Sequence, residues 1–498
     1  MPFATKSIMF QGTGSGVGKS LVAAAFCRVL RQRGIRVAPF KAQNMALNSF
    51  VTPDGLEMGR AQVFQAEACG LQPDVRMNPI LLKPQGDAQS QVVLMGKAVC
   101  NLSARSFYEH RDRHIAIAKE AYKSLARDFD VIVIEGAGSP AEINLHATDI
   151  VNMETASYAG APVVIIGDID RGGVFAWLKG TYDLVPDRHR PRIAGFLINK
   201  FRGDASLLSP GLEQFKRIIA LPFFGVLPWF DDITVDQEDG VYVNEVASRR
   251  GAPVKIAVIH LPRISNFTDF APLAFEKDVS VSFVRRPYEI KDCDCIIIPG
   301  TKTTRADLDF LKTSGWDTAI KRFLDENTFV LGICGGYQML GEEITDPHGV
   351  EGHAGISRGL GFLPVTTEIG VEKYLQHTTI LLNAPPVFAD PLEARGYEIH
   401  MGRTKALGSI VPLGRDIGPE IGAIGIDRPV MGLYLHGFFE NDLVRRRFLD
   451  YLRVRKGIFP VGQVSSYRAF RDSQFDMLAD WFSNNADMAG LLSLIGLE

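Results

Sequence analysis

The chain has 498 residues, of which 46% are hydrophobic, and its formal net charge is −3 without any long block of like charge. This composition allows a well-buried core in two or three domains and argues against a nucleic-acid-binding surface, while six cysteines are too few for a disulfide framework. Because no apolar run reaches the length of a membrane span and the N-terminus lacks the features of a signal peptide, we expect a soluble, cytoplasmic protein without membrane insertion.

A glycine-rich turn, QGTGSGVGKS at 11–20, follows the first predicted strand (SIMFQ) and precedes a helical stretch. Backbone amides of such a turn can hold phosphate at a helix N-terminus. Lys19 would reach the terminal phosphates, and the Ser20 hydroxyl would bind magnesium. The strict pattern has glycine where this chain has Thr13, so the match is to a variant loop. The sequence predicts nucleotide binding by Thr13, Gly14, Gly16, Val17, Gly18, Lys19 and Ser20.

The rest of the first half alternates short apolar strands with segments long enough for helices. This alternation predicts a doubly wound, parallel α/β sheet. The strands that we expect after the loop are VAPF, VIVIEG, PVVIIGD and RIAGFLIN.

Polar residues stand at the carboxyl ends of these strands, where open α/β sheets bind ligands. Glu135 ends VIVIEG and could bind Mg²⁺ through oxygen, although a turn or helix-capping carboxylate is the alternative. Asp168 and Asp170 follow the next strand and have the same two interpretations. Asn199, in NKFRGD, partly matches the base-reading N-K-x-D motif of other nucleotide enzymes, so we add it to the predicted nucleotide site.

A polar stretch ending in proline, NEVASRRGAP at 244–253, predicts a domain boundary. A second α/β series follows it, with one helix over 305–327. After residue 360 the strands come closer together, which suits an antiparallel extension. The expected strands are VKIAVIHLP, VSVSFV, CDCIIIPG, FVLGIC, HTTILLN, GYEIHMG, IGAIGI and VMGLYLHG. We therefore predict a first α/β domain, with the glycine-rich loop, over 1–245, a second α/β domain over 253–456 and a helical C-terminal extension over 457–498.

One cysteine stands at a sharp corner between a strand and a helix, in VLGICGGYQML at 330–340. A free cysteine is usually buried and inert, which is the alternative to a catalytic role. Glycines on both sides of Cys334 allow the strained turn of a nucleophile elbow, in which the side chain stands above the sheet. A catalytic cysteine also needs a histidine elsewhere in the chain.

These motifs together resemble the cobyric acid synthase family over nearly the whole chain. The first half is similar to dethiobiotin-synthetase-like, ATP-dependent amidoligases, and the second half to class I glutamine amidotransferases. The motifs that carry the resemblance are QGTGSGVGKS, PFKAQNMALNS, EGAGSPAEINL, DIDRGGVFA, GFLINKFRGD, GICGGYQMLG, GYEIHMG and YLHGFFEN.

The resemblance implies a reaction in cobalamin biosynthesis. The family amidates the b, d, e and g carboxylates of adenosylcobyrinic acid a,c-diamide to give adenosylcobyric acid. Glutamine supplies the nitrogen, and ATP is split to ADP and phosphate with Mg²⁺. The implied partners are the corrinoid substrate, glutamine and ATP, and we assign substrate binding to Lys41, Asn44 and His400.

The resemblance also supplies a partner for Cys334. It favours His436, at the end of VMGLYLH, as the general base, with His400 as the alternative. The amides of Gly335 and of the Gly300–Thr301 loop are the expected oxyanion hole. Triad amidotransferases carry a glutamate two residues after the histidine, where this chain has Phe438. A Cys–His dyad is therefore expected, and Glu440 and Glu398 stay open as orienting residues.

Other functions are compatible with parts of the sequence. A cobyrinic acid a,c-diamide synthase would use the same two modules, although the KAQNM and DIDRGG segments favour the later enzyme. A ParA/MinD-type ATPase switch has a related loop, but it leaves Cys334, His436 and the second domain without a role. A non-catalytic scaffold would require the loop and the elbow to have arisen by accident together.

Overall fold

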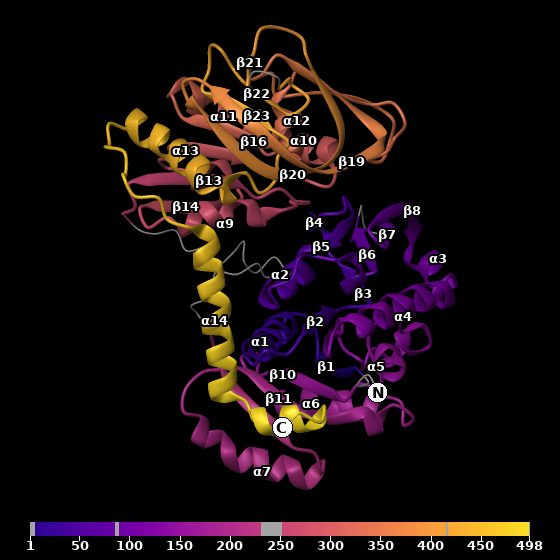
Figure 1. Cartoon of the computed structure of the whole chain (residues 1–498). Helices are drawn as coiled ribbons and strands as arrows, with labels where there is room; N and C mark the ends of the chain where they lie inside the picture. Colours follow the sequence, from indigo (N-terminus) through magenta and orange to yellow (C-terminus); the bar gives the residue numbers. More distant parts are fainter. Residues whose placement is uncertain (1–4, 85–88, 231–250, 415–416, 498) are drawn as a thin grey trace. The chain divides into compact units, whose positions relative to one another are not determined.

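The computed structural model describes residues 5–84, 89–230, 251–414 and 417–497 (Figure 1). The chain forms two compact units, of which the first comprises Met1–Ala46, Glu57–Asp239 and Arg471–Glu498, and the second Leu47–Leu56 and Gly240–Phe470. Residues 47–56 thus belong to the second unit, and the C-terminal residues to the first. The boundary predicted at 244–253 falls almost entirely outside the described residues, so the predicted domain limits stay a prediction.

The first unit is built on a six-stranded sheet in the order β12-β11-β10-β1-β9-β2, in which every neighbouring pair is parallel. Strands β2, β9 and β10 are buried throughout and largely apolar, as expected when helices cover both faces of a parallel sheet. The predicted doubly wound sheet is confirmed. The strands are β1 (Lys6–Gly12), β2 (Val37–Phe40), β9 (Val131–Glu135), β10 (Val163–Asp168), β11 (Ile193–Phe201) and β12 (Phe223–Pro228).

A smaller sheet, β3-β6-β7-β8, was not expected from the sequence. Its strands are short and lie between the crossover elements of the main sheet, where apolar periodicity is weak. They are β3 (Gln43–Met45), β6 (Ile80–Pro84), β7 (Gln89–Leu94) and β8 (Lys97–Ser103), with β5 (Glu57–Gly59) in the same part of the chain. The helices of the unit are α1 (Lys19–Gln32), α2 (Arg60–Ala68), α3 (Ala104–Glu109), α4 (Arg111–Asp128), α5 (Met153–Ala159), α6 (Val174–Leu184), α7 (Ser209–Ile218) and α15 (Met488–Leu494).

The C-terminal tail is helical, but its long helix α14 begins only at Tyr467 and runs to Asn485 (yellow in Figure 1). Its apolar side joins the core of the first unit, where Phe482 meets Phe26 of α1 edge to face at 6.0 Å. Arg28, also on α1, forms a 2.8 Å ion pair with Asp476. The tail therefore packs against the helix that follows the glycine-rich loop.

The second unit contains a seven-stranded sheet in the order β14-β13-β15-β16-β23-β22-β21. The five strands from β14 to β23 are parallel, and β22 and β21 continue the sheet in antiparallel pairs. These strands are β13 (Val254–Ile259), β14 (Val279–Val284), β15 (Cys295–Ile298), β16 (Phe329–Ile333), β21 (Val411–Pro412), β22 (Gly422–Ile424) and β23 (Val430–Leu433). The helices are α9 (Ala271–Phe275), α10 (Thr304–Thr313), α11 (Trp316–Asp325), α12 (Gly335–Leu340) and α13 (Asp442–Arg455).

The single helix expected over 305–327 is wrong. Two helices, α10 and α11, occupy this stretch, because Gly315 takes a left-handed conformation (φ 76°) between them. Glycine adopts this conformation without the steric cost that a β-carbon would bring, so it ends one helix and allows the next to start in a new direction.

The expected antiparallel extension is present as a long hairpin. Strand β19 (Val365–Ala384) pairs with β20 (Phe388–Ala406), and β17 (Glu343–Asp346) and β18 (Gly355–Arg358) complete a four-stranded sheet. Strand β4 (Ser49–Val51), from the N-terminal half of the sequence, also belongs to this unit.

Candidate functional site

Three neighbouring strands of the second unit place the predicted catalytic residues at one edge of its sheet. Strand β16 lies between β15 and β23, and all three are parallel, so their carboxyl ends meet at the same edge. Cys334 follows β16, Thr301 follows β15, and His436 follows β23. Ligands bind at this edge in open α/β sheets. The sheet order therefore explains why residues so far apart in sequence come together.

Cys334 stands at the expected elbow between β16 and α12. Its backbone angles, φ 52° and ψ −110°, lie outside the regions that residues with side chains prefer. The glycines around it are required by space, since a β-carbon at Gly336 would lie 1.9 Å from the Ile298 carbonyl oxygen. Held strain of this kind is typical of functional turns. The Cys334 thiol lies 3.7 Å from the Ile399 carbonyl oxygen.

The imidazole of His436 is held by an aspartate that sequence analysis missed. Nδ1 of His436 lies 2.6 Å from Asp269 Oδ2, and the amide of Gly437 donates to Asp269 Oδ1 at 3.0 Å. Asp269 belongs to a single helical turn, η5 (Phe267–Phe270), which follows the carboxyl end of β13. The expectation of a dyad without a carboxylate is therefore not what the geometry shows. The sequence did show a carboxylate in SNFTDF, between the first strand and the first helix of the unit, which could have been considered as a partner of the histidine.

The surroundings of His436 favour its protonated form. Burial alone would lower the pKa of this imidazole, but the charge and hydrogen bond of Asp269, with the hydrogen bond to Cys334, raise it to about 10. The fixed Nδ1 contact to Asp269 leaves Nε2 for the thiol side of the ring. A cysteine, a histidine and a carboxylate in this order have the arrangement of a nucleophilic triad.

The expected oxyanion loop lies beside the elbow. A β-carbon built on Gly335 would lie 2.7 Å from Thr301 Cγ2 and 3.2 Å from the Thr301 amide nitrogen. A β-carbon on Gly300 would lie 3.4 Å from Cε1 of His436. The structure thus brings Gly335, Gly300 and Thr301 together at the edge of the sheet that carries Cys334 and His436, where backbone amides could bind a developing oxyanion.

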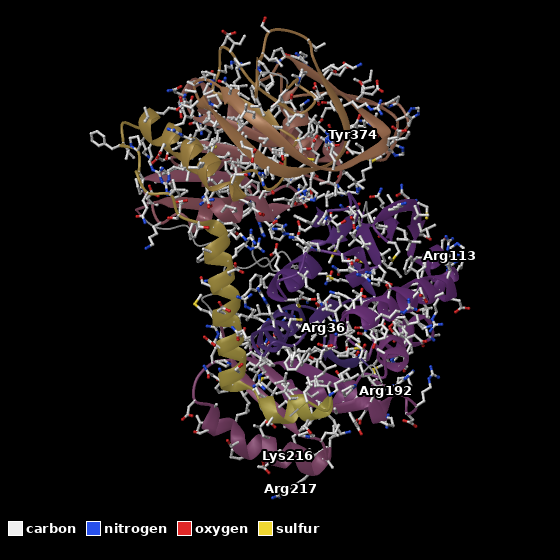
Figure 2. The ribbon with its side chains drawn as sticks, in the orientation of Figure 1. Arg36, Arg113, Arg192, Lys216, Arg217 and Tyr374 are labelled. Carbon is white, nitrogen blue, oxygen red and sulfur yellow. The ribbon has the colours of Figure 1, made fainter. Side chains whose placement is uncertain are left out.

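Glu398 and His400 form a separate pair rather than orienting His436. Nε2 of His400 lies 3.1 Å from Glu398 Oε2, and both side chains are buried. Tyr374 of β19, labelled in Figure 2, stacks on His400 with ring centroids 5.0 Å apart, and Tyr434 stacks on it at 3.8 Å. His400 is therefore not the histidine that shares the Asp269 contact.

We expect Asp269→Asn to lower the kcat for glutamine hydrolysis by roughly a hundredfold or more, because a neutral amide no longer stabilises the imidazolium of His436. Steady-state glutaminase kinetics would measure this loss. His436→Ala should lower kcat at least as much. Glu440 is the carboxylate that the sequence left open as an orienting residue, and Glu440→Gln should change the rate only modestly. A Glu440→Gln loss equal to that of His436→Ala, with Asp269→Asn near wild type, would contradict the assignment of Asp269.

The first unit presents the glycine-rich loop between β1 and α1. Gly16 and Gly18 have φ of 71° and 96°, and a β-carbon on Gly18 would lie 2.2 Å from the side-chain nitrogen of Asn199. Asn199 donates to the Val17 carbonyl at 2.9 Å, and the Lys200 ammonium donates to the Gly16 carbonyl at 2.6 Å. The NKFRGD motif thus supports the loop backbone directly.

Lys19 closes the loop. Its ammonium donates to the carbonyl of Gly14 at 2.8 Å and to that of Gly138 at 3.3 Å. The amide of Thr13 donates to the Ile166 carbonyl of β10 at 3.0 Å, which fixes the start of the loop on the sheet. The Lys19 side chain therefore folds back onto the backbone of the predicted phosphate loop at Gly14.

Glu135 meets both the loop serine and a second lysine. The Ser20 hydroxyl and the Lys41 ammonium donate to Glu135 Oε1 at 2.8 and 3.0 Å, and Gln65, which sequence analysis missed, donates to Oε2 at 2.5 Å. Burial alone would raise the pKa of the Glu135 carboxyl, but the charges of Lys41 and Lys19 and the hydrogen bond from Ser20 lower it. The group is therefore an anion at neutral pH.

A serine hydroxyl beside one carboxylate fits Mg²⁺, which binds few protein oxygens and takes its other ligands from phosphate and water. Among the described residues there is no cluster of three or more histidine, cysteine or carboxylate side chains that could hold a metal. Ser20 and Glu135 are thus a pair of ligands suited to a metal that arrives bound to a nucleotide. The described residues offer no cluster of side chains that could hold a metal without it.

Other predicted polar residues have structural partners. The side chain of Asn44 donates to Gln62 Oε1 at 3.0 Å, and Asn44 is buried. Asp168 accepts from the Lys200 ammonium at 2.9 Å and from the Asp170 amide at 2.9 Å. These contacts favour the turn interpretation of Asp168 over metal binding.

Comparisons with known proteins agree with this division of the chain. Residues 8–241 match the family described as a CobQ/CobB/MinD/ParA nucleotide binding domain, and residues 255–444 match a CobB/CobQ-like glutamine amidotransferase domain. A protein of Thermoanaerobacter sp. (strain X514) named "Cobyric acid synthase" is 46% identical over 492 residues, covering 97% of each chain. Proteins with the same name from Klebsiella pneumoniae (strain 342) and Salmonella typhimurium (strain LT2) are 47% and 46% identical, with at least 95% of each chain covered.

The chain belongs to the cobyric acid synthase family. It is an ATP-dependent amide ligase with a glutamine amidotransferase domain, and its role is an amidation in cobalamin biosynthesis. Within the described residues, the helices are all too short or too polar to span a bilayer.

Proposed function

We propose that this member of the cobyric acid synthase family amidates the b, d, e and g carboxylates of adenosylcobyrinic acid a,c-diamide, with ATP and glutamine, to give adenosylcobyric acid. The observation that carries the proposal is the pairing of a Cys334–His436–Asp269 constellation in one unit with a lysine-closed phosphate loop in the other. The resemblance to named relatives over the whole chain supports the substrate.

The first unit activates the carboxylate. A carboxylate does not react with ammonia at neutral pH, because oxide is a very poor leaving group. Transfer of the γ-phosphoryl group of ATP to a corrin carboxylate oxygen turns that oxygen into part of a phosphate leaving group. Lys19 offsets charge on the transferred group, and loop amides hold the phosphates. Mg²⁺ on Ser20 and Glu135 would supply further positive charge. Lys41 and Asn44 are the proposed contacts to the corrinoid.

The second unit releases ammonia from glutamine. His436, whose surroundings favour the imidazolium, holds the proton of Cys334, and the resulting thiolate attacks the side-chain amide carbon of glutamine. The tetrahedral oxyanion is held by amides of Gly335 and the Gly300–Thr301 loop. The imidazolium of His436, stabilised by Asp269, returns the proton to the leaving nitrogen, so ammonia departs and a thioester forms. Water, deprotonated by His436, then cleaves the thioester to glutamate and restores the thiol.

Incubation of the pure protein with ATP, the a,c-diamide and glutamine labelled with ¹⁵N in its side-chain amide tests the proposal. We expect product whose mass corresponds to amides at the b, d, e and g positions, each carrying ¹⁵N, with ADP formed in step. Turnover of cobyrinic acid itself in preference to the a,c-diamide would instead support the earlier synthase of the pathway. Absence of corrin amidation with either substrate would overturn the assignment.

A further inference from the structure

A short segment from the N-terminal half of the sequence packs into the second unit. Residues 47–56 lie between two stretches of the first unit in sequence, yet they belong to the compact unit that carries Cys334. The segment includes β4, and its Asn48, Ser49 and Val51 are buried. Buried asparagine and serine are stable only where their polar atoms find partners, so their contacts indicate what the segment does.

The segment holds the turn that presents Asp269. The amide of Asn266 donates to Asn48 Oδ1 at 2.7 Å, and the amide of Ser49 donates to Asn266 Oδ1 at 3.1 Å. Asn266 has φ of 52° and directly precedes η5, and its carbonyl accepts from the Asp269 amide at 3.1 Å. A left-handed asparagine needs support from its surroundings. The reciprocal pair with Asn48 and Ser49 provides that support one helical turn from Asp269.

The same segment contacts the other side of the histidine through Tyr397. The Tyr397 hydroxyl donates to the Ser49 carbonyl at 3.3 Å, and the Phe50 ring lies 4.7 Å from the Tyr397 ring. Tyr397 stacks on His436 with centroids 5.4 Å apart and planes 25° apart. The backbones of Tyr397 and His436 also exchange two hydrogen bonds, at 3.0 and 2.9 Å. The ring of His436 is thus bounded by Tyr397, which contacts Ser49 and Phe50, and by Asp269, whose turn contacts Asn48 and Ser49 through Asn266.

Residues of β19 fix the far end of the segment. Nε2 of His377 lies 2.8 Å from the Val51 carbonyl oxygen and 3.2 Å from that of Thr52. Val51 forms a small apolar cluster with Tyr397 and Ile399, the residue whose carbonyl faces the Cys334 thiol. The segment is therefore anchored along its length to the parts of the unit that line the catalytic edge.

We propose that residues 47–56, and Asn48 and Ser49 in particular, are positioning residues of the glutaminase reaction. They hold Asp269 and Tyr397 against His436, although they are encoded within the synthetase half of the chain. The amidotransferase-family region, residues 255–444, is consequently incomplete as a catalyst without this segment. The inference rests on the proposed roles of Cys334 and His436 in glutamine hydrolysis.

The test uses full-length variants. Asn48→Ala removes the acceptor for the Asn266 amide, and Asn48→Asp keeps an oxygen at that position. Asn327→Ala is the control, since the Asn327 side chain likewise accepts a hydrogen bond, from Arg455, but Asn327 precedes the amino end of β16, at the opposite edge of the sheet from Cys334. We expect Asn48→Ala to lower the kcat for glutamine hydrolysis about ten- to a hundredfold with KM for glutamine little changed. Asn48→Asp should recover much of the loss, and Asn327→Ala should match wild type.

The pH profile separates positioning from general destabilisation. The titratable groups that face His436 are Asp269 from η5, Cys334 from the elbow and Tyr397 from β20. If Asn48→Ala loosens Asp269, the alkaline limb of kcat/KM for glutamine moves to lower pH by about one unit or more, because the imidazolium has lost stabilisation. Loss of folded protein alone would lower kcat/KM by the same factor at every pH and leave the pH of the alkaline limb unchanged.

Ammonium-dependent amidation and the thermal midpoint complete the experiment. Asn48→Ala should amidate with ammonium at the wild-type rate and melt within a few degrees of Asn327→Ala. An unchanged glutaminase kcat in Asn48→Ala, or an unshifted pH profile with equal losses for both nitrogen sources, would overturn the positioning role. Failure of the proposed function itself is distinguishable, since it would appear as glutamine use that persists when Cys334 is replaced.

Discussion

Replacing Cys334 by serine should abolish amidation with glutamine and leave amidation with added ammonium salt intact. The serine removes the thiolate nucleophile, whereas the phosphate loop belongs to the other compact unit. We expect the glutamine-dependent rate to fall by at least on the order of a thousandfold. The ammonium-dependent rate should rise with pH over the range in which the enzyme is stable, since only NH₃ has a lone pair to attack the activated carboxyl. Product formation with each nitrogen source measures both expectations.

Cys295→Ser is the matched control for this variant. Cys295 is a fully buried cysteine on β15, the strand next to β16, and it lies away from the elbow. A serine hydroxyl in an apolar core costs stability, so Cys295→Ser should melt lower but still use glutamine. If Cys334→Ser instead lost both nitrogen sources together with its thermal midpoint, Cys334 would be a core residue. Persistent glutamine use would show that another residue is the nucleophile.

Replacing Lys19 by alanine should abolish corrin amidation with glutamine and with ammonium alike. Lys19 donates to the carbonyl of Gly14 in the loop and to that of Gly138, and in the proposed mechanism its charge offsets that of the terminal phosphates. Loss of a preorganised charge at a transferring phosphoryl group predicts a decrease of at least roughly a hundredfold. ADP release and corrin mass measure the decrease.

Glutamine hydrolysis should survive in Lys19→Ala, because the thiol, His436 and Asp269 all lie in the second unit. Lys216→Ala, at an exposed position on α7 labelled in Figure 2, controls for the loss of one positive charge. Wild-type amidation by Lys19→Ala would remove the lysine from the phosphate site. Equal losses in Lys216→Ala would point to net charge rather than position.

Local sequence patterns were sufficient to predict the parts of the fold in which apolar strands alternate regularly with helices. Buried parallel strands such as β9 and β10 are continuous runs of valine and isoleucine, so their class and order could be predicted. The elbow at Cys334 was visible because glycine is required on both sides of it, as the 1.9 Å approach at Gly336 shows. The break at Gly315 was missed because the apolar period continues across it into α11.

The carboxylate that contacts His436 could not be predicted by spacing from the histidine. Asp269 is 167 positions from His436 along the chain and reaches it through the order of strands in the sheet, which no short motif records. The position two residues after the histidine, Phe438, is instead buried in the core. For the same reason, nothing in the letters of residues 47–56 shows that they pack beside Asn266 and Tyr397.

The buried His436 also links the stability of the second unit to pH. Its folded pKa of about 10 lies above the ordinary value of 6.5, so the native state binds a proton that the unfolded chain releases between these pH values. The associated stabilisation is complete below about pH 6.5 and is lost as pH rises through 10. Alkaline conditions raise the fraction of free ammonia, but they also remove this stabilisation from the second unit. That unit is the one whose use of glutamine makes added ammonia unnecessary. Glutamine lets the enzyme obtain its nitrogen at a pH where this proton is still bound.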